Sequence, residues 1–436
     1  MLNRRSHTVR VLAGCIAAAA ALALAACGSG GSTGSAGSGK TTVTFLNWEA
    51  TEQTPLGNAI HRFEQQNPDI SVDIQPAVTG NAYDTKMRTA LAGGSPPDIF
   101  RINDDYVQQF TRNGALKDLS PYVKQDKLNT ADYAKQVFDF GLQPDGRMTS
   151  WQIGYQPAIV FYNKDMFKAA GVPLPPTTWT ANGWTWDIFL RDAQRLTRGT
   201  AQYGAVVSAS SNYEQTFAHN NGSPTGIWSE DGKTFTLADP KGAAAVQWVA
   251  DLTCKQKVQP PWADLQQTNA NVQLFAQGKV AMMFERSGSL PYLQSTIKNF
   301  DWDIAPPPAK MDQSTEASDV VFAIPSKAKH ADAAWKLLKY LASPEGGQIV
   351  GQGNAYVPVN IAAAKALYAK RSGKPASVQL LADSAQHLTA TTKTDNTLGA
   401  RQIYRPALDD VYNCNKSASD VLQGVKSQVD TALARG

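Results

Sequence analysis

The chain has 436 residues, of which 42% are apolar and 18% charged, and its formal net charge is +4 at neutral pH. This length and apolar content are ample for a core and indicate two domains, or about three by simple division. Three positive charges, Arg4, Arg5 and Arg10, belong to a segment that we expect to be removed, so the mature chain sits near +1 and a nucleic acid partner is not implied.

The N-terminal segment has the pattern of an export signal. Arginines precede an apolar run, Val11 to Ala26, which ends in small residues directly before Cys27. This order predicts a signal peptide over residues 1–26. The apolar run has 16 residues. A transmembrane helix needs roughly 20, so the short run favours cleavage over a permanent membrane span.

The segment Leu24 to Cys27 (LAAC) resembles the bacterial lipobox, in which the cysteine thiol takes a diacylglycerol and becomes the first residue. We therefore expect Cys27 to be lipidated and the protein to be extracytoplasmic, anchored to the outer face of the cell membrane. The alternative is ordinary secretion, with Cys27 as a chance apolar residue. Residues 28–39 are mostly Gly and Ser, so residues 27–40 are predicted as a flexible linker about 20 Å long on average.

The chain contains four cysteines. Cys15 belongs to the signal peptide and Cys27 to the lipid site, which leaves Cys254 and Cys414. Outside the cell, two remaining cysteines on ordered elements more often pair than stay free, so we predict a disulfide between Cys254 and Cys414. The alternative is two buried free thiols.

Short β patterns alternate with amphipathic helical patterns from Thr41 onward. The first strands are predicted at 43–46, 70–74 and 98–102, with helices at 55–66 and 83–91 between them. This alternation predicts an α/β architecture with a parallel sheet and helices on both faces. Ligands of such sheets lie beyond the carboxyl ends of the strands, which indicates residues 47–49 and 103–106.

The same alternation continues toward the C-terminus. Further strands are predicted at 158–162, 204–208, 280–284 and 320–324, and further helices at 186–196, 242–252, 271–277, 331–341 and 418–434. No internal repeat of fixed period interrupts this pattern.

Five short stretches form a recognisable set. They are Phe63 to Pro68 (FEQQNP), Gly94 to Phe100 (GSPPDIF), Phe161 to Asp165 (FYNKD), Phe275 to Met282 (FAQGKVAM) and Ala333 to Leu338 (AAWKLL). Together they resemble the extracellular solute-binding proteins, particularly the carbohydrate-binding group (family 1) that includes maltose-binding protein. The stretches follow the family's order across residues 41–434, and a lipobox suits such a receptor in a cell without an enclosed periplasm.

The resemblance implies a two-lobed, periplasmic-binding-protein-like (type II) α/β fold with a ligand cleft and a hinge of several crossing segments. The crossings are expected near 154–157, 318–321 and 356–360. The lobes that follow are 41–154 with about 320–356 (lobe 1), and about 155–319 with 357–436 (lobe 2). The resemblance further implies a monomer that captures an extracellular sugar or oligosaccharide and delivers it to an ABC-type permease, with no enzymatic activity and no cofactor.

Sugar sites combine hydroxyl-binding carboxylates, amides and Arg with flat aromatic faces. Trp48 and Glu49 lie where the first strand opens into the predicted cleft, and the alternative is a core Trp beside a solvated Glu. Asp105 matches an acidic, hydroxyl-binding residue of the maltose-binding group. Asn103 and Asp104 share its loop, where helix capping would explain one of the three without a ligand.

Gln156 lies on the first crossing, where the family often carries a carboxylate, so the amide puts the pattern of hydroxyl contacts in doubt. Trp151 and Tyr155 flank Gln156 as possible stacking faces. The remaining candidates for ligand contact are Asn212, Tyr213, Asn221, Asp319, Tyr356 and Arg401.

Arg286, Ser287 and Gly288 follow a predicted strand where the family places ligand contacts, although the Trp usual nearby is absent. Arg286 has an alternative role, because it would equally pair with Glu285 or with a helix terminus.

An enzyme is the main competing hypothesis, because Asp104 and Asp105 offer two carboxylates for a secreted glycosidase. That chemistry needs carboxyls on opposite sides of a bond, about 5 to 9 Å apart. Two further patterns match catalytic or phosphate-binding motifs by letter: residues 30–34 match Gly-x-Ser-x-Gly, and residues 34–41 match a P-loop. Both lie in the predicted linker, without the preceding strand and following helix that these motifs need. A binder of a polyol or amino acid and a structural lipoprotein are further alternatives. The scattered single histidines argue against zinc, and no metal is predicted.

Overall fold

The computed structural model describes residues 39–207, 213–389 and 392–435. Residues from Lys40 onward form one compact unit. The predicted signal peptide and Cys27 lie outside the described residues. Within those residues, no helix has both the length and the apolar character needed to cross a membrane.

The described strands form one mixed sheet in the order β2-β1-β3-β8-β4-β6-β5, with β7 and β9 paired to β4 off this path. The strands are β1 (Thr41–Leu46), β2 (Ile70–Ile74), β3 (Ile99–Arg101), β4 (Trp151–Asn163), β5 (Tyr203–Val207), β6 (Val280–Arg286), β7 (Trp302–Ala305), β8 (Ala317–Ala323) and β9 (Val357–Pro358). β1 pairs in parallel with β2 and β3, and β5 pairs in parallel with β6.

The centre of the sheet differs from the prediction, because β4 and β8 are antiparallel to their neighbours. A parallel neighbour needs a crossover connection, usually a helix. β7 and β8 instead both run antiparallel to β4, along successive parts of its length, and residues 306–316, which join them, contain no helix. The predicted parallel sheet is therefore right for the two ends of the sheet and wrong for its centre.

β4 joins the two halves of this sheet. Residues 151–157 pair with β8, and residues 158–163 pair with β6 and β7. Only Gln156 among the 13 residues of β4 is not fully buried. Successive β4 residues enter different cores, because a strand points alternate side chains to opposite faces. Phe161 joins a cluster that includes the β1 residues, whereas Tyr162 joins a second cluster built on β5 and β6.

The three segments predicted to cross between lobes lie side by side. Tyr155 of β4 is opposite Asp319 of β8 on one edge and opposite Val357 of β9 on the other. The adjacent residue Gln156 is opposite Ser318. One short stretch of hydrogen-bonded backbone therefore holds all three segments.

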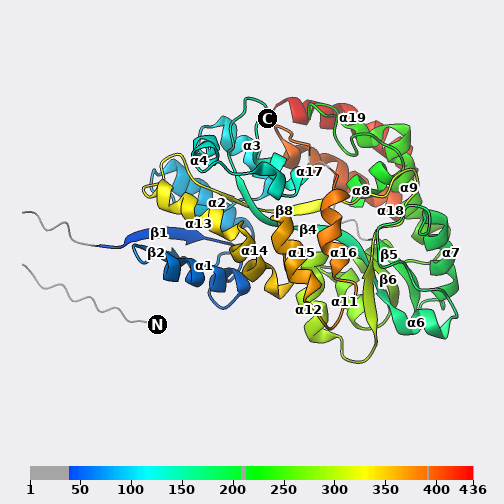
Figure 1. Ribbon diagram of the computed structural model, residues 1–436. Coiled ribbons are helices and arrows are strands. Elements are labelled where there is room, and N and C mark those ends of the chain that lie inside the picture. Colours follow the sequence, from blue (N-terminus) through cyan, green and yellow to red (C-terminus); the bar gives the residue numbers. More distant parts are fainter. Residues whose placement is uncertain (1–38, 208–212, 390–391, 436) are drawn as a thin grey trace, which may run out of the picture. The chain divides into compact units, whose positions relative to one another are not determined.

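Helices surround both ends of the sheet, with β4 and β8 between the helices near β1 and β2 and those near β5 and β6 (Figure 1). They are α1 (Pro55–Gln66), α2 (Gly80–Ala92), α3 (Asp104–Arg112), α4 (Ser120–Gln125), α5 (Lys135–Gly141), α6 (Lys164–Ala169), α7 (Trp186–Leu196), α8 (Tyr213–Asn220), α9 (Pro240–Cys254), α10 (Trp262–Leu265), α11 (Ala270–Ala276), α12 (Leu290–Thr296), α13 (Ala331–Leu341), α14 (Pro344–Val350), α15 (Ile361–Ala369), α16 (Gln379–Asp383), α17 (Thr397–Ala407), α18 (Asp409–Tyr412) and α19 (Ala418–Ala434). The predicted bounds of α1, α7, α13 and α19 are confirmed. Hydroxyl caps at Thr54 and Thr185 begin α1 and α7, as their sequences indicate.

Cys254, the last residue of α9, forms the predicted disulfide with Cys414, which follows α18. Their Cα atoms are 5.5 Å apart and their sequence separation is 160 residues. The prediction of this bond is confirmed, and the alternative of two free thiols is excluded. The disulfide links two helical segments that pack on the second core cluster.

Replacing both Cys254 and Cys414 by Ser should lower the free energy of unfolding by about 2 to 4 kcal/mol, because the bond restricts the unfolded chain over a long loop. Urea unfolding with and without dithiothreitol measures this loss. Reduction should bring the natural chain to the stability of the double variant and leave the variant unchanged. A natural chain that keeps its stability after complete reduction would contradict the prediction.

Candidate functional site

Charged side chains from four separate parts of the chain meet beside the middle of β4. Asp104 and Asp105 begin α3, and Arg286 ends β6. Glu316 directly precedes β8, and Arg401 lies on α17. The helix start follows from local sequence, because the Asn103 side chain accepts a hydrogen bond from the Asp105 amide at 3.1 Å and so caps α3. Capping thus accounts for Asn103, as the alternative hypothesis for this loop proposed.

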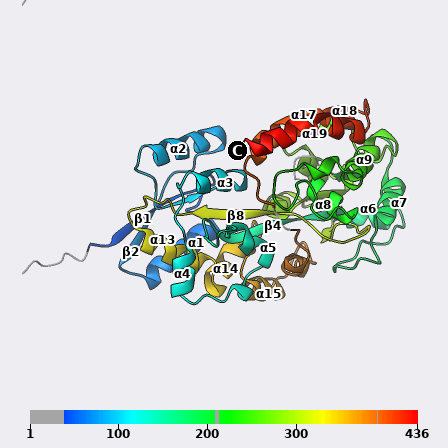
Figure 2. The same ribbon diagram turned by 90° about the horizontal axis from the view of Figure 1, so that it is seen from above.

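Two of these arginines form close ion pairs between distant segments. Arg401 donates from Nη1 to Asp105 at 2.6 Å, which connects α17 to α3. Arg286 donates from Nε and Nη2 to the two oxygens of Glu316 at 3.0 and 3.1 Å, a bidentate geometry. Figure 2 shows α3 and α17 close to one another from above. The Asp105 and Arg401 pair therefore joins two segments that lie far apart in the sequence.

Burial raises the pKa of several carboxyls in this group. The pKa of Asp105 rises to about 6, because burial and the neighbouring Asp104 outweigh Arg401. Burial raises the pKa of Glu316 to about 7 despite its pair with Arg286. The pKa of Asp319 is raised well above its ordinary value by burial, and then by Asp104 and Glu316. Burial and mutual repulsion thus disfavour the charged form of these carboxyls. They therefore bind protons at higher pH than the same side chains would in water.

Gln156 and Gly288 meet where the loop after β6 approaches the first crossing. Gln156 donates from Nε2 to the Ala355 carbonyl oxygen at 2.9 Å. A Cβ atom on Gly288 would lie 2.5 Å from the same Nε2 atom. A glycine is therefore needed for this loop to lie against β4 without displacing Gln156.

An aromatic group extends this site toward β1. Trp48 is half-buried and packs edge-on against Tyr83, with ring centres 5.4 Å apart. The Tyr356 hydroxyl donates a short hydrogen bond to the exposed Glu49. The Arg101 guanidinium lies over both the Trp48 and Tyr356 rings. The residues predicted on the first strand loop and on the third crossing are thus brought together.

The space directly between these charged side chains is small, although Asp105 also borders a separate cavity of 250 Å³ with Arg88, Arg112 and Asp395. A cavity of 30 Å³ is bordered by Asp104, Asp105, Trp228, Lys393 and Arg401, among others. Because one water needs about 10 to 15 Å³ by a comparable measure, this space is too small for a sugar ring. A solute would enter only if the two sides of the group separated.

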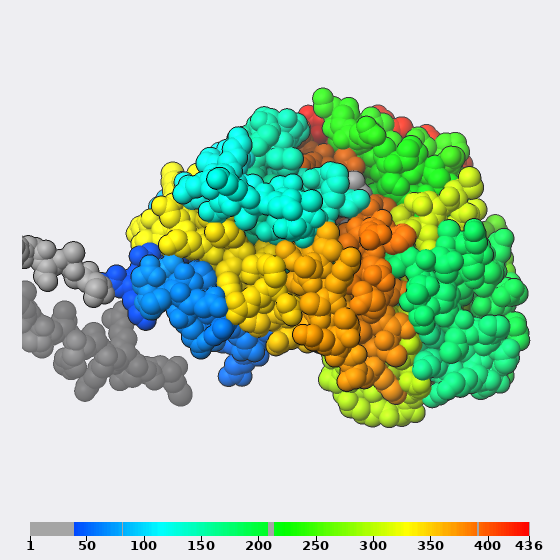
Figure 3. Space-filling model, viewed as in Figure 1, coloured from blue at the N-terminus to red at the C-terminus, as the bar shows by residue number. Residues whose placement is uncertain are grey.

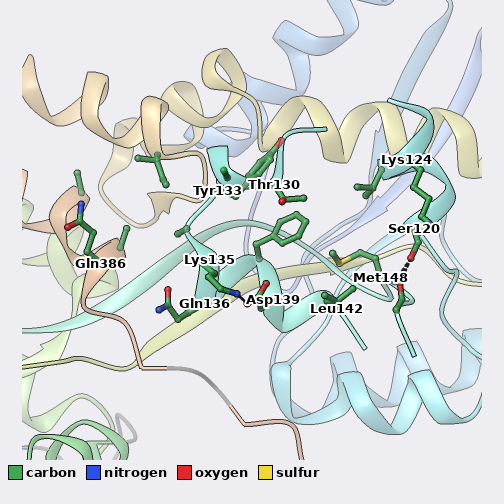
Figure 4. A pocket seen from close by; sticks show the side chains of 18 of the residues that line it. Ser120, Lys124, Thr130, Tyr133, Lys135, Gln136, Asp139, Leu142, Met148 and Gln386 are labelled. Carbon is green, nitrogen blue, oxygen red and sulfur yellow. Dashed lines mark hydrogen bonds and ion pairs between the residues drawn. The ribbon is translucent and has the colours of Figure 1, made fainter. Parts of the chain in front are cut away.

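A larger cavity of 770 Å³ lies elsewhere, between the segment of α4 and α5 and the segment of α15 and α16. In Figure 3 these segments, cyan and orange, border one another on the surface. Tyr133, Leu142 and Met148 contribute to its mostly apolar lining (Figure 4). None of the predicted ligand-binding residues borders it. The charged residues that do line it, Lys124, Lys135, Asp139 and Lys365, are different from those of the site beside β4.

Several predicted site residues lie away from the charged group. Trp151 is only 1% exposed and packs edge-on against Trp335, with ring centres 4.8 Å apart. Tyr155 is buried in the same core cluster, and Tyr213 is buried in the second cluster, against Phe217. Their sizes and chain positions did not distinguish a core aromatic from a stacking face.

Asn221 and Ser287 are also outside the charged group. Asn221 donates to the Lys241 carbonyl oxygen at 2.6 Å and so stabilises the turn after α8. Ser287 is fully buried after β6. The prediction for Asn212 lies outside the described residues.

The sequence interpretation missed three charged residues of the site, Arg101, Glu316 and Arg405. Arg405 lies 3.7 Å from Glu214 and four residues after Arg401, so both arginines occupy one side of α17. Had a helix been predicted there, the spacing of four residues would have indicated that Arg405 lies on the same side as Arg401. Glu316 directly precedes the crossing strand, and Arg101 was interpreted only as part of a strand. Among the described residues, no group of three or more His, Cys, Asp or Glu side chains is arranged to hold a metal ion.

Residues 19–348 match the family model of the bacterial extracellular solute-binding proteins, and the chain belongs to this family. The sn-glycerol-3-phosphate-binding periplasmic protein UgpB of Agrobacterium fabrum is 26% identical over 364 residues, which cover 80% of each protein. The chain is therefore a solute-binding protein that acts outside the cytoplasm, and the prediction that it is not an enzyme is confirmed.

Solved structures show the fold. An ABC substrate-binding protein from Listeria monocytogenes, in complex with cycloalternan, superposes with a TM-score of 0.78 at 24% identity, over 91% of this chain and 99% of that one. The sugar-binding protein MalE from Xanthomonas citri gives a TM-score of 0.78 at 22% identity, over 91% and 98%. The predicted periplasmic-binding-protein fold of mixed α/β type is confirmed.

Replacing Asp319 by Asn should stabilise the protein above about pH 4. The native carboxyl keeps its proton to higher pH than the unfolded one, so its contribution to stability is present below the unfolded pKa of about 3.9 and is lost as pH rises toward the raised native value. The amide imitates the protonated acid, so the variant should be more stable than the natural chain at pH 7.

Urea unfolding of both proteins between pH 4 and pH 8 measures this difference, which should grow with pH. The exposed Asp69, replaced by Asn, is a matched control and should show no such trend. A constant difference between Asp319→Asn and the natural chain at every pH would contradict the prediction.

Proposed function

We propose that this protein captures an extracellular sugar or oligosaccharide in a cleft between two lobes and delivers it to an ABC-type permease. The observation that carries the proposal is the arrangement beside β4. Three adjacent strands contain the segments that we expect to cross between the lobes, and carboxylates, arginines and an amide from both proposed lobes lie beside them. Opening at the strands would separate these groups, and a solute would replace their mutual contacts.

The side chains suit a solute with many hydroxyl groups. Asp104 and Asp319 accept hydrogen bonds, Arg286 and Arg401 donate them, and Gln156 does both. Trp48 adds a half-buried ring on which the apolar face of a sugar would stack. The mixture supports binding through hydroxyls better than binding of a purely apolar solute.

The names of related proteins support the same class of solute. The Listeria monocytogenes protein was solved with cycloalternan, and the Xanthomonas citri protein is described as sugar-binding. The Agrobacterium fabrum relative is described as binding sn-glycerol-3-phosphate. A phosphorylated polyol is the second candidate, and the several arginines of the site favour it over a neutral polyol.

Two further parts of the proposal concern the lobes and the anchor. Residues 41–154 with about 320–356 would form one lobe, and about 155–319 with 357–436 the other. A lipid on Cys27 would hold the protein at the outer face of the membrane through the linker of residues 27–40. The tether would raise the local concentration of the loaded protein at its permease.

Calorimetric titration of the purified protein with mono- and oligosaccharides tests the solute. A sugar should bind one to one and be recovered intact by chromatography. Asp104→Asn should weaken that binding about 10- to 100-fold, because a hydrogen bond to a charged group contributes about 1.5 to 3 kcal/mol. Asp69→Asn, on the exposed loop before β2, should bind normally. Binding of amino acids without any sugar would overturn the solute class, and release of a cleaved sugar would overturn the receptor function.

Cys27→Ala tests the anchor in cells. The variant should appear in the culture medium and support less uptake, because it loses the lipid, while its affinity for the solute stays unchanged. Detergent partitioning and quantitative blotting of cells and medium measure the distribution. Retention of the variant on cells to the level of the natural chain would contradict lipidation at Cys27.

A further inference from the structure

We propose that the solute carries an acidic group, a carboxylate or a phosphate, and that Arg101 binds it. This inference rests on the function proposed above and narrows its class of solute. Arg101 ends β3, immediately before the loop that leads to α3, and the residue is 5% exposed. It was not among the residues that the sequence indicated.

Aromatic rings from three segments surround the Arg101 guanidinium. Its central carbon lies 4.6 Å from the Trp48 ring centre, 5.4 Å from that of Phe322 and 5.7 Å from that of Tyr356. These rings follow β1, lie on β8 and precede β9. Ring faces attract a cation without accepting conventional hydrogen bonds from its N–H groups.

The Nε and Nη1 atoms of Arg101 are buried without a hydrogen-bond partner. In the described ranges, no carboxylate lies within the ion-pair distance of 4.0 Å from Arg101. By contrast, Arg286, Arg401 and Arg405 each face a carboxylate within that distance. Arg101 therefore has unused donors and no counter-charge in direct contact, which is unfavourable for a buried guanidinium.

The nearby acids do not contact Arg101 directly. Glu49 accepts its short hydrogen bond from the Tyr356 hydroxyl. Burial, Asp104 and Glu316 raise the pKa of Asp319, which disfavours a negative charge on its carboxyl, and Asp319 makes no ion pair with Arg101. The positive charge at Arg101 is thus available to an oxygen anion from outside the chain.

A solute in the proposed cleft would reach this position. Asp319 lies close enough to Arg101 for the guanidinium to lower its pKa, and Asp319 also belongs to the charged group beside β4. Trp48 is half-buried and Glu49 is exposed, so the aromatic group borders solvent. A solute whose hydroxyls contact Asp104 and Asp319 would place an acidic substituent between these residues and Arg101, where it gains a charge-assisted hydrogen bond.

Calorimetric titration of the full chain at constant ionic strength tests this inference with matched pairs of probes. The pairs are glucose with glucuronate, glucose with glucose 6-phosphate, and glycerol with glycerol 3-phosphate. At least one acidic probe should bind ten times or more tighter than its neutral partner. Tighter binding of glucuronate identifies a carboxylate, and tighter binding of the phosphorylated probes identifies a phosphate.

The Arg101 variants then assign the effect to this side chain. Arg101→Met should remove the preference for the acidic probe, whereas Arg101→Lys should keep part of it because the charge remains. Arg62→Met, a change at an exposed arginine paired with Glu345, should keep all of it. Circular dichroism and melting temperature establish that each variant is folded, and the Lys variant provides the test if the Met variant is not.

Equal binding of neutral and acidic probes, or an unchanged preference in folded Arg101→Met, would overturn the acidic solute while leaving a sugar receptor intact. Failure of every probe and of every sugar in the earlier panel would overturn both proposals together.

Discussion

The backbone of β4 imposes the central constraint on this molecule. A strand buried along nearly its whole length has no water to bind its N–H and C=O groups, so each needs a partner from another strand. β4 finds these partners in β8 and β9 over one part of its length and in β6 and β7 over the next. The two halves of the sheet, their helices and the charged group all take their positions from this strand.

The charged group is held closed against a considerable electrostatic cost. Buried carboxyls gather around Asp104, and their raised pKa values show that the arginines do not fully compensate for burial. Removing such groups from water is unfavourable unless pairing is nearly complete. The same groups in an open arrangement would be hydrated. The site is therefore built from side chains that gain by meeting a polar solute, since hydroxyls would supply the hydrogen bonds that neighbouring carboxyls cannot supply to one another.

The sequence was informative where a local signal determines structure. Amphipathic spacing was sufficient for α1, α7, α13 and α19, and cysteine counting was sufficient for the disulfide. α17 was missed because Gly399 and Pro406 lie inside it and both disfavour a helix. Tertiary packing decides that segment, and with it the surroundings of Arg401.

The candidate site was predictable only in part, for the same reason. Asp104, Asp105 and Arg286 follow predicted strands. Ligands of α/β sheets lie beyond the carboxyl ends of strands, and those ends can be predicted from the sequence. Trp151 and Tyr155 also lie on a predicted strand, but the face that each side chain occupies depends on what packs above and below β4. Arg101 was harder still to predict from the sequence. The rings around it belong to Trp48, Phe322 and Tyr356, and no local sequence pattern connects these residues.

The ion pair between Asp105 and Arg401 has a consequence for how affinity arises. At this pair a solute does not meet a free carboxylate, because Asp105 already accepts hydrogen bonds from Arg401. Binding is therefore an exchange, and the measured affinity is the difference between the new contacts and the old pair. A good competitor must match a guanidinium and a carboxylate at once, which penalises small or singly functional molecules more than their contact area suggests. The internal pair thus sets a threshold for recognition that abundant, weakly interacting solutes outside the cell would not pass.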